Sequence, residues 1–497
     1  MNKFVLISVL LILLKGNVVC GQEMLGATLG NYSGINSIQL NPGAMNSSKL
    51  WLDVQLAGGD LFFQNNFLYL AKREFVLWDI LNAGFKFPSH NEDYGTEVRS
   101  FYTYRNNRPK DGFFNLRLNG PGAMLIWGDH AFGIHTAVRS IFSFHNLSYD
   151  IANFLYLGLN FKPQQNTRYD DDKRIWLGGL SWFEAGISYA YKVYGRGFDR
   201  VDAGISIRKL FGVAGLYMVS DDANYIVLND STLQVNNLHA EFGLSLPMDY
   251  TSGFNFQTDP LTTGGGWGFD LGAVYTRLVR PHQKYQVSRL CEQPYEDYIY
   301  RIGISLIDVG GIRFNQKAGK YLIDNRASLW EDLNSFTFRS IDHLLDTISY
   351  KFYGNSSTAQ VDDHFTLWLP AAISVQFDYH YRNKWYLNAT LFYPVSLSKA
   401  TLHRPAQLAI TPRYESRWWE VNLPISLQDW RLVRLGLSLR LYFLTIGTEK
   451  LGQFFRFNDF TGLDFYFSIK IPFEKGVCRS KGSGDCPAYE DYQRWKL

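Results

Sequence analysis

Hydrophobic and polar residues alternate one by one in segments that recur from about residue 113 to residue 473. In residues 434–441, every second residue is leucine, and arginine, glycine or serine stands at each position between. Successive side chains of a strand point to opposite faces, so this segment predicts a strand with one apolar and one polar face. Other clear alternations cover residues 183–193, 201–208, 241–246, 267–276, 373–380 and 463–473. The repeated period of two predicts an all-β protein.

The number and length of these segments indicate how the strands are arranged. About a dozen segments with no long helical pattern between them predict a transmembrane antiparallel β-barrel over residues 50–473. Each is about as long as a tilted strand needs to be to cross a bilayer. We expect about fourteen strands, within a range of twelve to sixteen. A soluble β-sandwich would also alternate, but the many large aromatic residues and the lack of domain linkers favour the barrel.

The register of the alternation assigns a direction to each face. A slip of one residue would turn charged side chains toward lipid, at a cost of up to about 4 kcal/mol each near the midplane. The predicted lumen-facing polar residues are Arg117, Arg139, Glu184, Asp202, Arg208, Glu241, Asp270, Arg301, Asp378, Arg434 and Arg440. Such residues either line a permeation path or form ion pairs that fill the lumen. The mixture of both signs favours ion pairs.

The first residues predict export. Lys3 gives a basic start, and the apolar run from Phe4 to Leu14 is too short to span a membrane as a helix. Residues 1–21 therefore predict a secretory signal peptide that is cleaved after Gly21. A lipoprotein signal ending at Cys20 is the alternative, although the residues before it fit that pattern poorly. Export together with barrel strands predicts the cell outer membrane as the location.

Two end segments of the exported chain do not fit the barrel wall. Residues 22–49 are rich in turn-forming residues and contain no alternating strand. Residues 474–497 are polar, contain glycine and follow the last strand, so we expect a partly disordered periplasmic tail. The wall itself is expected to have short periplasmic turns and long outer loops, with some long segments folding into the lumen. The long connections are expected at about 71–112, 140–182, 247–266, 277–297 and 316–364.

One of the long connections also predicts a helix. Residues 340–348 begin with Ser340, a good helix N-cap, and continue with apolar residues at helical spacing. A short helix is therefore expected in this connection.

The amino-acid composition agrees with a barrel, and the net charge bears on which partners are expected. Aromatic residues make up 16% of the 497 residues and charged residues 19%, as expected for a wall with aromatic rims. The net charge of +3 gives no reason to expect nucleic acid as a partner. Three cysteines remain after cleavage. A Cys478–Cys486 disulfide would close a short loop and leave Cys291 unpaired, while free thiols are the alternative.

Motifs for catalysis or metal binding are weak. Gly-x-Ser recurs in mid-strand at 186–188, 204–206, 243–245, 303–305 and 436–438, but it never becomes Gly-x-Ser-x-Gly. Small residues that make room inside the barrel explain these sites better. The glycine-rich residues 264–268 lack the last glycine of a dinucleotide loop. Asp170–Asp172 could bind calcium, but basic neighbours favour a solvated turn. We therefore predict no catalytic residue, cofactor or metal centre.

Two blocks near the N-terminus carry a family resemblance. Asn31-Tyr-Ser-Gly-Ile-Asn36 and Leu40-Asn-Pro-Gly43 resemble an uncharacterised family of outer-membrane β-barrels from Bacteroidota, a domain of unknown function. Residues 266–273, 301–311, 447–452 and 459–464 resemble further blocks of that family in the same order. The chain is also distantly similar to FadL-type transporters of hydrophobic compounds and to PorV, a barrel of the type IX secretion system.

In those barrels the Asn-Pro region lies inside the lumen as a hatch. The resemblance therefore implies a hatch at residues 22–49, with a motif made of Asn31, Gly34, Asn36, Asn41, Pro42 and Gly43. Gly43 stands where alanine is commoner, a change that leaves the turn intact. The uncharacterised family itself has no established activity to transfer.

Two functions follow as hypotheses. The first is passive, porin-like transport of a hydrophobic or small ligand through a FadL-like barrel. The alternative is a scaffold or carrier subunit of a secretion or envelope-assembly system, in the manner of PorV. The expected partners are outer-membrane lipid, a small hydrophobic ligand and a secretion or envelope protein. A membrane-embedded hydrolase has little support.

Overall fold

The computed structural model describes residues 24–478, apart from 83, 92–97, 252–259, 283–288, 334–336, 338 and 399. The predicted signal peptide and residues 479–497 of the predicted tail therefore lie outside the described residues. No helix of the described chain is long and apolar enough to cross a membrane.

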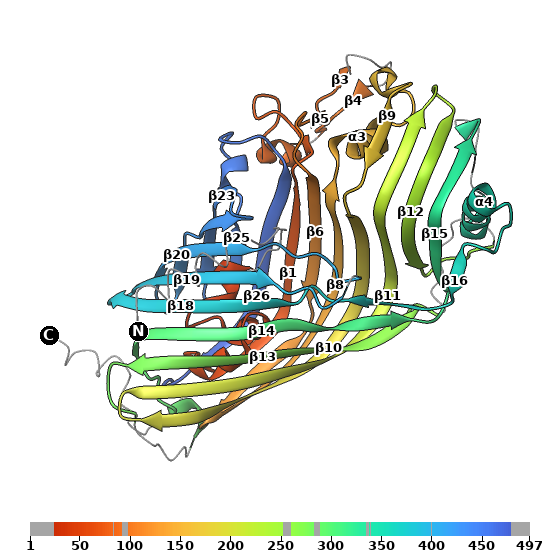
Figure 1. Cartoon of the computed structure of the whole chain (residues 1–497). Helices are drawn as coiled ribbons and strands as arrows, with labels where there is room; N and C mark the ends of the chain where they lie inside the picture. The colour runs from red at the N-terminus through yellow and green to blue at the C-terminus, as the bar shows by residue number, and fades with distance from the viewer. Residues whose placement is uncertain are drawn as a thin grey trace, which may run out of the picture.

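One antiparallel sheet closes on itself to form a barrel (Figure 1). Strands that follow one another in the chain lie side by side, and the first wall strand pairs with the last from Leu50↔Glu474 to Gln64↔Gly462. The predicted all-β barrel and its fourteen strands are thus confirmed.

The fourteen wall strands are continuous or built from two or three collinear pieces. In chain order they are β1 (Leu50–Asn65), β6 with β7 (Lys110–Asn119, Gly122–Trp127), β8 (His130–Leu147), β10 (Ile175–Arg196), β11 (Asp199–Val227), β12 with β13 (Leu233–Ser245, Gly264–Leu278), β14 with β15 (Tyr298–Phe314, Ala318–Trp330), β16, β17 and β18 (Gln360–Asp362, Phe365–Trp368, Ala372–Arg382), β19 (Trp385–Pro394), β20 (Gln407–Glu415), β21 with β22 (Trp419–Asn422, Ile425–Gln428), β23 with β24 (Leu432–Leu435, Leu437–Leu441), β25 (Leu444–Thr448) and β26 (Gly462–Glu474).

Breaks between collinear pieces have local causes. Pro121 follows the end of β6, and Pro424 separates β21 from β22; neither residue can donate a ladder hydrogen bond. The prediction of an outer loop at 247–266 is wrong, because β11 pairs with β12 along one half and with β13 along the other. This segment therefore interrupts a wall strand partway along the wall.

The two ends of the barrel differ in the length of their connections. One end, the short-turn end, has turns such as 128–129, 197–198 and 383–384, whereas the other, the loop end, has connections such as 66–109 and 395–406. The long connection expected at 277–297 is present at 279–297, but it joins β13 to β14 at the short-turn end rather than at the loop end. The predicted loops 140–182 and 316–364 are also too long, because β8, β10, β15 and β16 continue into them.

Part of the wall extends past the rest at the loop end. β11 has 29 residues, far more than the 9–11 that cross a bilayer. Its outer half pairs with β12 and with β9 (Arg168–Asp171), and β12 pairs with β15. We call the outer half of β11, together with β9, β12 and β15, the projecting sheet; it is visible at the upper right of Figure 1.

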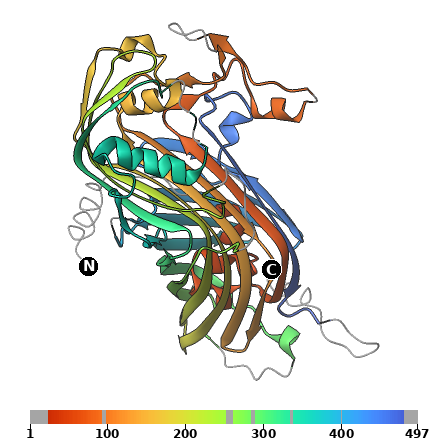
Figure 2. The ribbon, with the colours of Figure 1, turned by 90° about the vertical axis from the view of Figure 1, so that its right-hand side faces the viewer.

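The predicted helix is present as α4 (Ile341–Tyr353), and the Oγ of Ser340 accepts a hydrogen bond from His343 N at 3.1 Å. The helix lies beside the projecting sheet (Figure 2). Its C-terminal end covers the edge of β15, where the Tyr353 hydroxyl accepts from Asp324 N and donates to Leu322 O. The helix thus protects backbone groups that an open strand edge would expose.

The remaining elements lie in the connections. They are β2 (Leu68–Tyr69), η4 (Leu77–Leu81), β3 (His90–Asn91), β4 (Val98–Arg99), β5 (Tyr102–Thr103), α3 (Tyr149–Leu157), η5 (Lys162–Gln164), η6 (Leu290–Glu292) and η8 (Leu451–Gln453).

The two faces of the wall differ as the alternation predicts. Every wall strand exposes at least one large apolar side chain on the outside; Ile187 is 64% exposed and Ile304 57%. The neighbouring positions point inward and carry buried polar and charged groups. The apolar outside and polar inside reverse the arrangement of a soluble protein.

Candidate functional site: the lumen and its inner segment

Residues 24–49, which we call the inner segment, lie inside the barrel. This segment consists of α2 (Leu25–Thr28), η2 (Gly34–Gln39) and η3 (Pro42–Ser47), drawn in red within the wall in Figure 1. Nearly all of its residues are buried. The six residues of the hatch motif all belong to it, and their contacts are described in turn below.

Asn31 is hydrogen-bonded to two wall residues and to one residue of the connection between β13 and β14. Its Nδ2 donates to both carboxylate oxygens of Glu415, at 3.0 and 3.1 Å. Its Oδ1 accepts from Arg301 Nη1 at 2.7 Å and from the Tyr295 hydroxyl at 2.9 Å. A shorter or apolar side chain would leave a buried carboxylate and guanidinium without these partners.

Gly34 lets the chain approach β1 closely. Its φ is +54°, and a Cβ at this position would lie 2.0 Å from Asp53 Oδ2. That oxygen accepts from Ile35 N at 2.8 Å and pairs with Lys470 Nζ at 3.0 Å. The same ammonium donates to the carbonyls of residues 32 and 33. Asn36 extends this contact, since its Nδ2 donates to Ser468 Oγ at 3.0 Å.

The Asn41-Pro42-Gly43 turn sits against small residues of the wall. Asn41 caps η3 by accepting from Gly43 N at 2.9 Å, and its Nδ2 donates to Gln376 Oε1 at 2.9 Å. A Cβ on Gly204 would lie 2.6 Å from Gly43 N, and one on Gly272 would lie 2.0 Å from Asn41 Oδ1. Gly204 belongs to one of the Gly-x-Ser repeats, which here leave room for the inner segment rather than forming a nucleophile elbow.

The eleven charged residues that the alternation assigned to the lumen have their side chains on the inner side of the wall. Seven of them form ion pairs with one another or with nearby groups in two clusters, and Asp202 pairs with Arg200 at 2.9 Å. Glu241 lies near the rim with Lys320 at 3.1 Å, and Arg434 donates to Gln64 at 2.9 Å. Arg301 donates to Asn31, as described above, and to the Tyr295 hydroxyl at 3.1 Å.

The first cluster, the arginine cluster, is centred on Asp308. Arg139 pairs with this carboxylate through two bonds of 2.8 and 3.1 Å, Arg208 at 2.9 Å and Arg404 at 3.1 Å. Arg208 also pairs with Asp270 at 2.7 Å. The remaining members are Arg117 and Glu184, 3.3 Å apart.

Sequence reasoning missed Asp308 and Arg404. Asp308 has a φ of +56° at a register shift between β13 and β14, and such a bulge breaks the alternation that marks the faces. Arg404 belongs to the connection 395–406, which carries no alternation. The sequence therefore contained no signal for the centre of the cluster.

The second cluster lies beside Asn31. Arg413 pairs with Asp378 and with Glu415, both at 3.2 Å, and Lys49 pairs with Glu415 at 2.7 Å. Arg440 pairs with Glu420 at 3.1 Å. The inner segment is thus held by charged groups from many strands, which favours the ion-pair interpretation of the lumen.

Cavities remain on two sides of the inner segment. One has room for a few water molecules and is lined by Leu29, Asn41, Arg301 and Asp378 among others. Another has room for about one water molecule and is lined by Ile35 and Gln39 on the inner segment, by Arg117, and by Gly120 at the break between β6 and β7. Polar and apolar groups are mixed in both linings.

The disulfide differs from the predicted one. Cys478 is bonded to Cys291, which lies 187 residues away, and not to Cys486. Cys486 lies outside the described residues. The chain after β26 turns back beside the connection 279–297, where Gly476 N donates to Cys291 O at 2.7 Å. Spacing along the sequence could not reveal this contact between distant segments.

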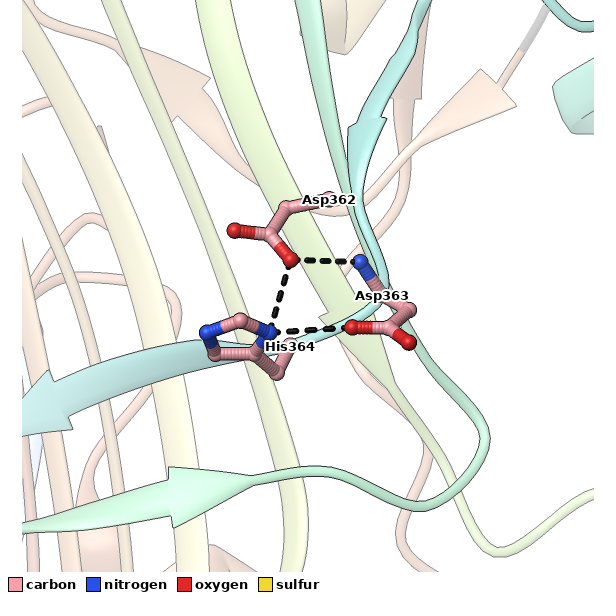
Figure 3. A group of neighbouring side chains, drawn as sticks. All are labelled: Asp362, Asp363 and His364. Carbon is pink, nitrogen blue, oxygen red and sulfur yellow. Dashed lines mark hydrogen bonds and ion pairs between the residues drawn. The ribbon is translucent and has the colours of Figure 1, made fainter.

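One group of side chains in the described chain has the composition of a metal site. Asp362 ends β16, and Asp363 and His364 follow it before β17, with the His364 Nδ1 2.7 and 2.9 Å from the two carboxylates (Figure 3). All three are partly or fully exposed on one short turn, an arrangement common without a metal. Asp170–Asp172 do not converge in this way among the described residues.

Comparisons with known proteins identify a family and similar barrels. A family model described as "Family of unknown function (DUF5723)" matches residues 42–449. No curated protein matches significantly. Among solved structures, a Pseudomonas aeruginosa FadL homologue is 12% identical with a TM-score of 0.39, covering 92% of this chain and all of that one. A TodX monoaromatic hydrocarbon channel mutant is 9% identical with a TM-score of 0.38, covering 89% and 95%.

Proposed function

We propose a transport function for this chain, which belongs to the DUF5723 family of unknown function. The chain acts as an outer-membrane barrel that admits a small or hydrophobic ligand when its inner segment shifts. The inner segment serves as the hatch. No chemical reaction is assigned to it.

The outer surface supports a place in the lipid bilayer. Apolar side chains cover the wall around its whole circumference, with aromatic residues such as Trp127, Trp385 and Trp419 exposed at the short-turn ends of strands. In water this surface would be far larger than the few hundred Å² of apolar patch that soluble monomers tolerate. Export by the predicted signal peptide would bring such a barrel to the outer membrane.

The observation that carries the transport proposal is the polar contact between the inner segment and the wall. The segment meets the wall largely through hydrogen bonds and ion pairs, such as those of Asn31 and Lys49, which water can replace when the contact opens. A small displacement would join the two cavities into a path through the lumen.

A scaffold role in secretion or envelope assembly is the second candidate. The projecting sheet and α4 favour it, because they extend beyond the length needed to cross a bilayer. A stable partner in a mild-detergent purification, lost when α4 and its flanking loops are trimmed, would support this role. A barrel that passes solutes without any partner favours transport.

Uptake into proteoliposomes tests the transport proposal. Vesicles containing the purified protein are mixed with a neutral sugar, a small carboxylate and a small aromatic hydrocarbon in separate assays. We expect at least one solute to enter faster than into protein-free vesicles. Equal rates for every solute, with both the wild type and an Asn31→Ala variant in a folded barrel, would contradict the proposal.

A further inference from the structure

Two segments close the short-turn end of the barrel beneath the inner segment. Residues 289–297 come from the connection between β13 and β14, and residues 475–478 follow β26. The Cys291–Cys478 disulfide joins them, and we call the joined pair the strap. The disulfide is therefore the covalent link between the chain end and the base of the opposite wall.

Both parts of the strap contact the inner segment directly. The Tyr295 hydroxyl donates to Asn31 Oδ1 at 2.9 Å. Lys475 N donates to Lys49 O at 2.8 Å, and Lys475 Nζ lies 3.4 Å from Asn46 O. The strap thus covers the point where the inner segment passes into β1.

The two parts are held to the wall very differently. Residues 289–297 have wall contacts of their own: Gln293 Nε2 donates to Ile126 O at 2.8 Å, and Glu296 pairs with Arg200 at 2.9 Å. Residues 475–478 are held by the disulfide, by the bond from Gly476 N to Cys291 O, and by the contacts of Lys475. Loss of the disulfide would therefore release residues 475–478, while residues 289–297 would keep their own contacts with the wall.

Lys475 occupies an unfavourable place. Burial, together with the positive charges of Arg200 and Lys192, lowers the pKa of Lys475 to about 7. An ammonium in such surroundings gains free energy by moving into water.

We propose that the Cys291–Cys478 disulfide is a reducible lock on the inner segment. Both cysteines are partly exposed, so a dithiol donor can reach them. Its thiolate attacks one sulfur, a mixed disulfide forms, and the second donor thiolate resolves it. The chain gains two electrons and two protons as two thiols, and the donor leaves as a disulfide. Residues 475–478 then swing away, and the lower part of the inner segment, residues 41–49, loosens.

The biological role of the lock rests on the proposed transport function, in which the short-turn end would face the periplasm. The structural change is measured without any solute. Amide hydrogen exchange is followed by mass spectrometry on the full exported protein in detergent, with and without a dithiol reductant. We expect exchange in residues 41–49 to become at least tenfold faster on reduction, while residues 31–36, held by Asp53 and Glu415, change less than twofold.

Two variants sharpen the experiment. The double variant Cys291→Ser with Cys478→Ser should exchange like the reduced wild type, with or without reductant. The matched control, Cys486→Ser, should keep the full response, because it leaves the disulfide intact. The wild-type comparison stands on its own if the double variant does not fold.

Unchanged exchange in residues 41–49 on complete reduction would overturn the lock. If no solute is transported but hydrogen exchange in residues 41–49 still becomes faster on reduction, the proposed function is wrong and the lock is supported. Transport that is present while exchange does not respond would remove the lock alone.

Discussion

Gly34 is the residue whose substitution should loosen the inner segment most specifically. A methyl group there would meet the Asp53 carboxylate, which also holds Ile35 N and Lys470. We predict that Gly34→Ala displaces the inner segment and raises solute influx into proteoliposomes severalfold over the wild type.

Gly128→Ala is the matched control for this change. Gly128 has a φ of +62°, close to that of Gly34, but nothing lies within 4 Å of a Cβ there. Both variants bear the same cost of about 1–2 kcal/mol for a left-handed alanine, so only the contact with Asp53 separates them. Equal influx through both variants would show that the contact does not hold the segment.

Asp308 should contribute more to stability than any other residue of the arginine cluster, because three guanidinium groups share its carboxylate. We predict that Asp308→Asn lowers the free energy of unfolding by about 3–5 kcal/mol, since it leaves buried cations without their partner. The measurement is urea unfolding in lipid vesicles, followed by tryptophan fluorescence.

A carboxylate-to-amide change near the rim provides the control. Glu241 pairs with Lys320, and both side chains are about one third exposed. Glu241→Gln should cost less than about 1 kcal/mol, because solvent screens such a pair. Similar losses for the two variants would mean that the arginine cluster is not tightly coupled.

The sequence carried part of this residue-level picture. Alternation records which side of a strand a residue faces, so residues such as Arg208 could be assigned to the polar face. Alternation does not record which inward residues meet across the lumen, nor does it survive a bulge, as at Asp308. Contacts between distant segments, such as Cys291 with Cys478, left no local signal at all.

Among the elements, the outward faces of the wall strands should tolerate charge only away from the bilayer. Ile304 on β14 is 57% exposed, and Val361 on β16, near the loop end, is 53% exposed. We predict that Ile304→Arg costs about 2–4 kcal/mol in lipid vesicles, as an arginine does at the midplane.

Val361→Arg should cost less than about 1 kcal/mol, because β16 lies far beyond the bilayer part of its wall strand, β18. Unfolding in vesicles measures both variants. If Ile304→Arg were as harmless as Val361→Arg, the outer face of β14 would not meet lipid.

The elements themselves were mostly predictable. Period-two segments located the wall, and Ser340 with its apolar spacing located α4. The breaks within wall strands were not predictable, because prolines such as Pro121 and Pro424 look like ordinary turn signals. The connection 279–297 was misplaced because its length resembles an outer loop. Both features depend on which distant strands pair with each other, and the local sequence does not encode that pairing.

For the whole molecule, the central claim is that an apolar-sided barrel is kept closed by the inner segment. The clearest test is ion conductance in planar bilayers, comparing the wild type with a variant that lacks residues 24–46. The variant keeps Lys49 and all fourteen wall strands, and its folding is checked by heat-modifiable migration. We predict small or rare currents for the wild type and a persistently open pore for the variant. A folded variant that conducts no better than the wild type would contradict the account.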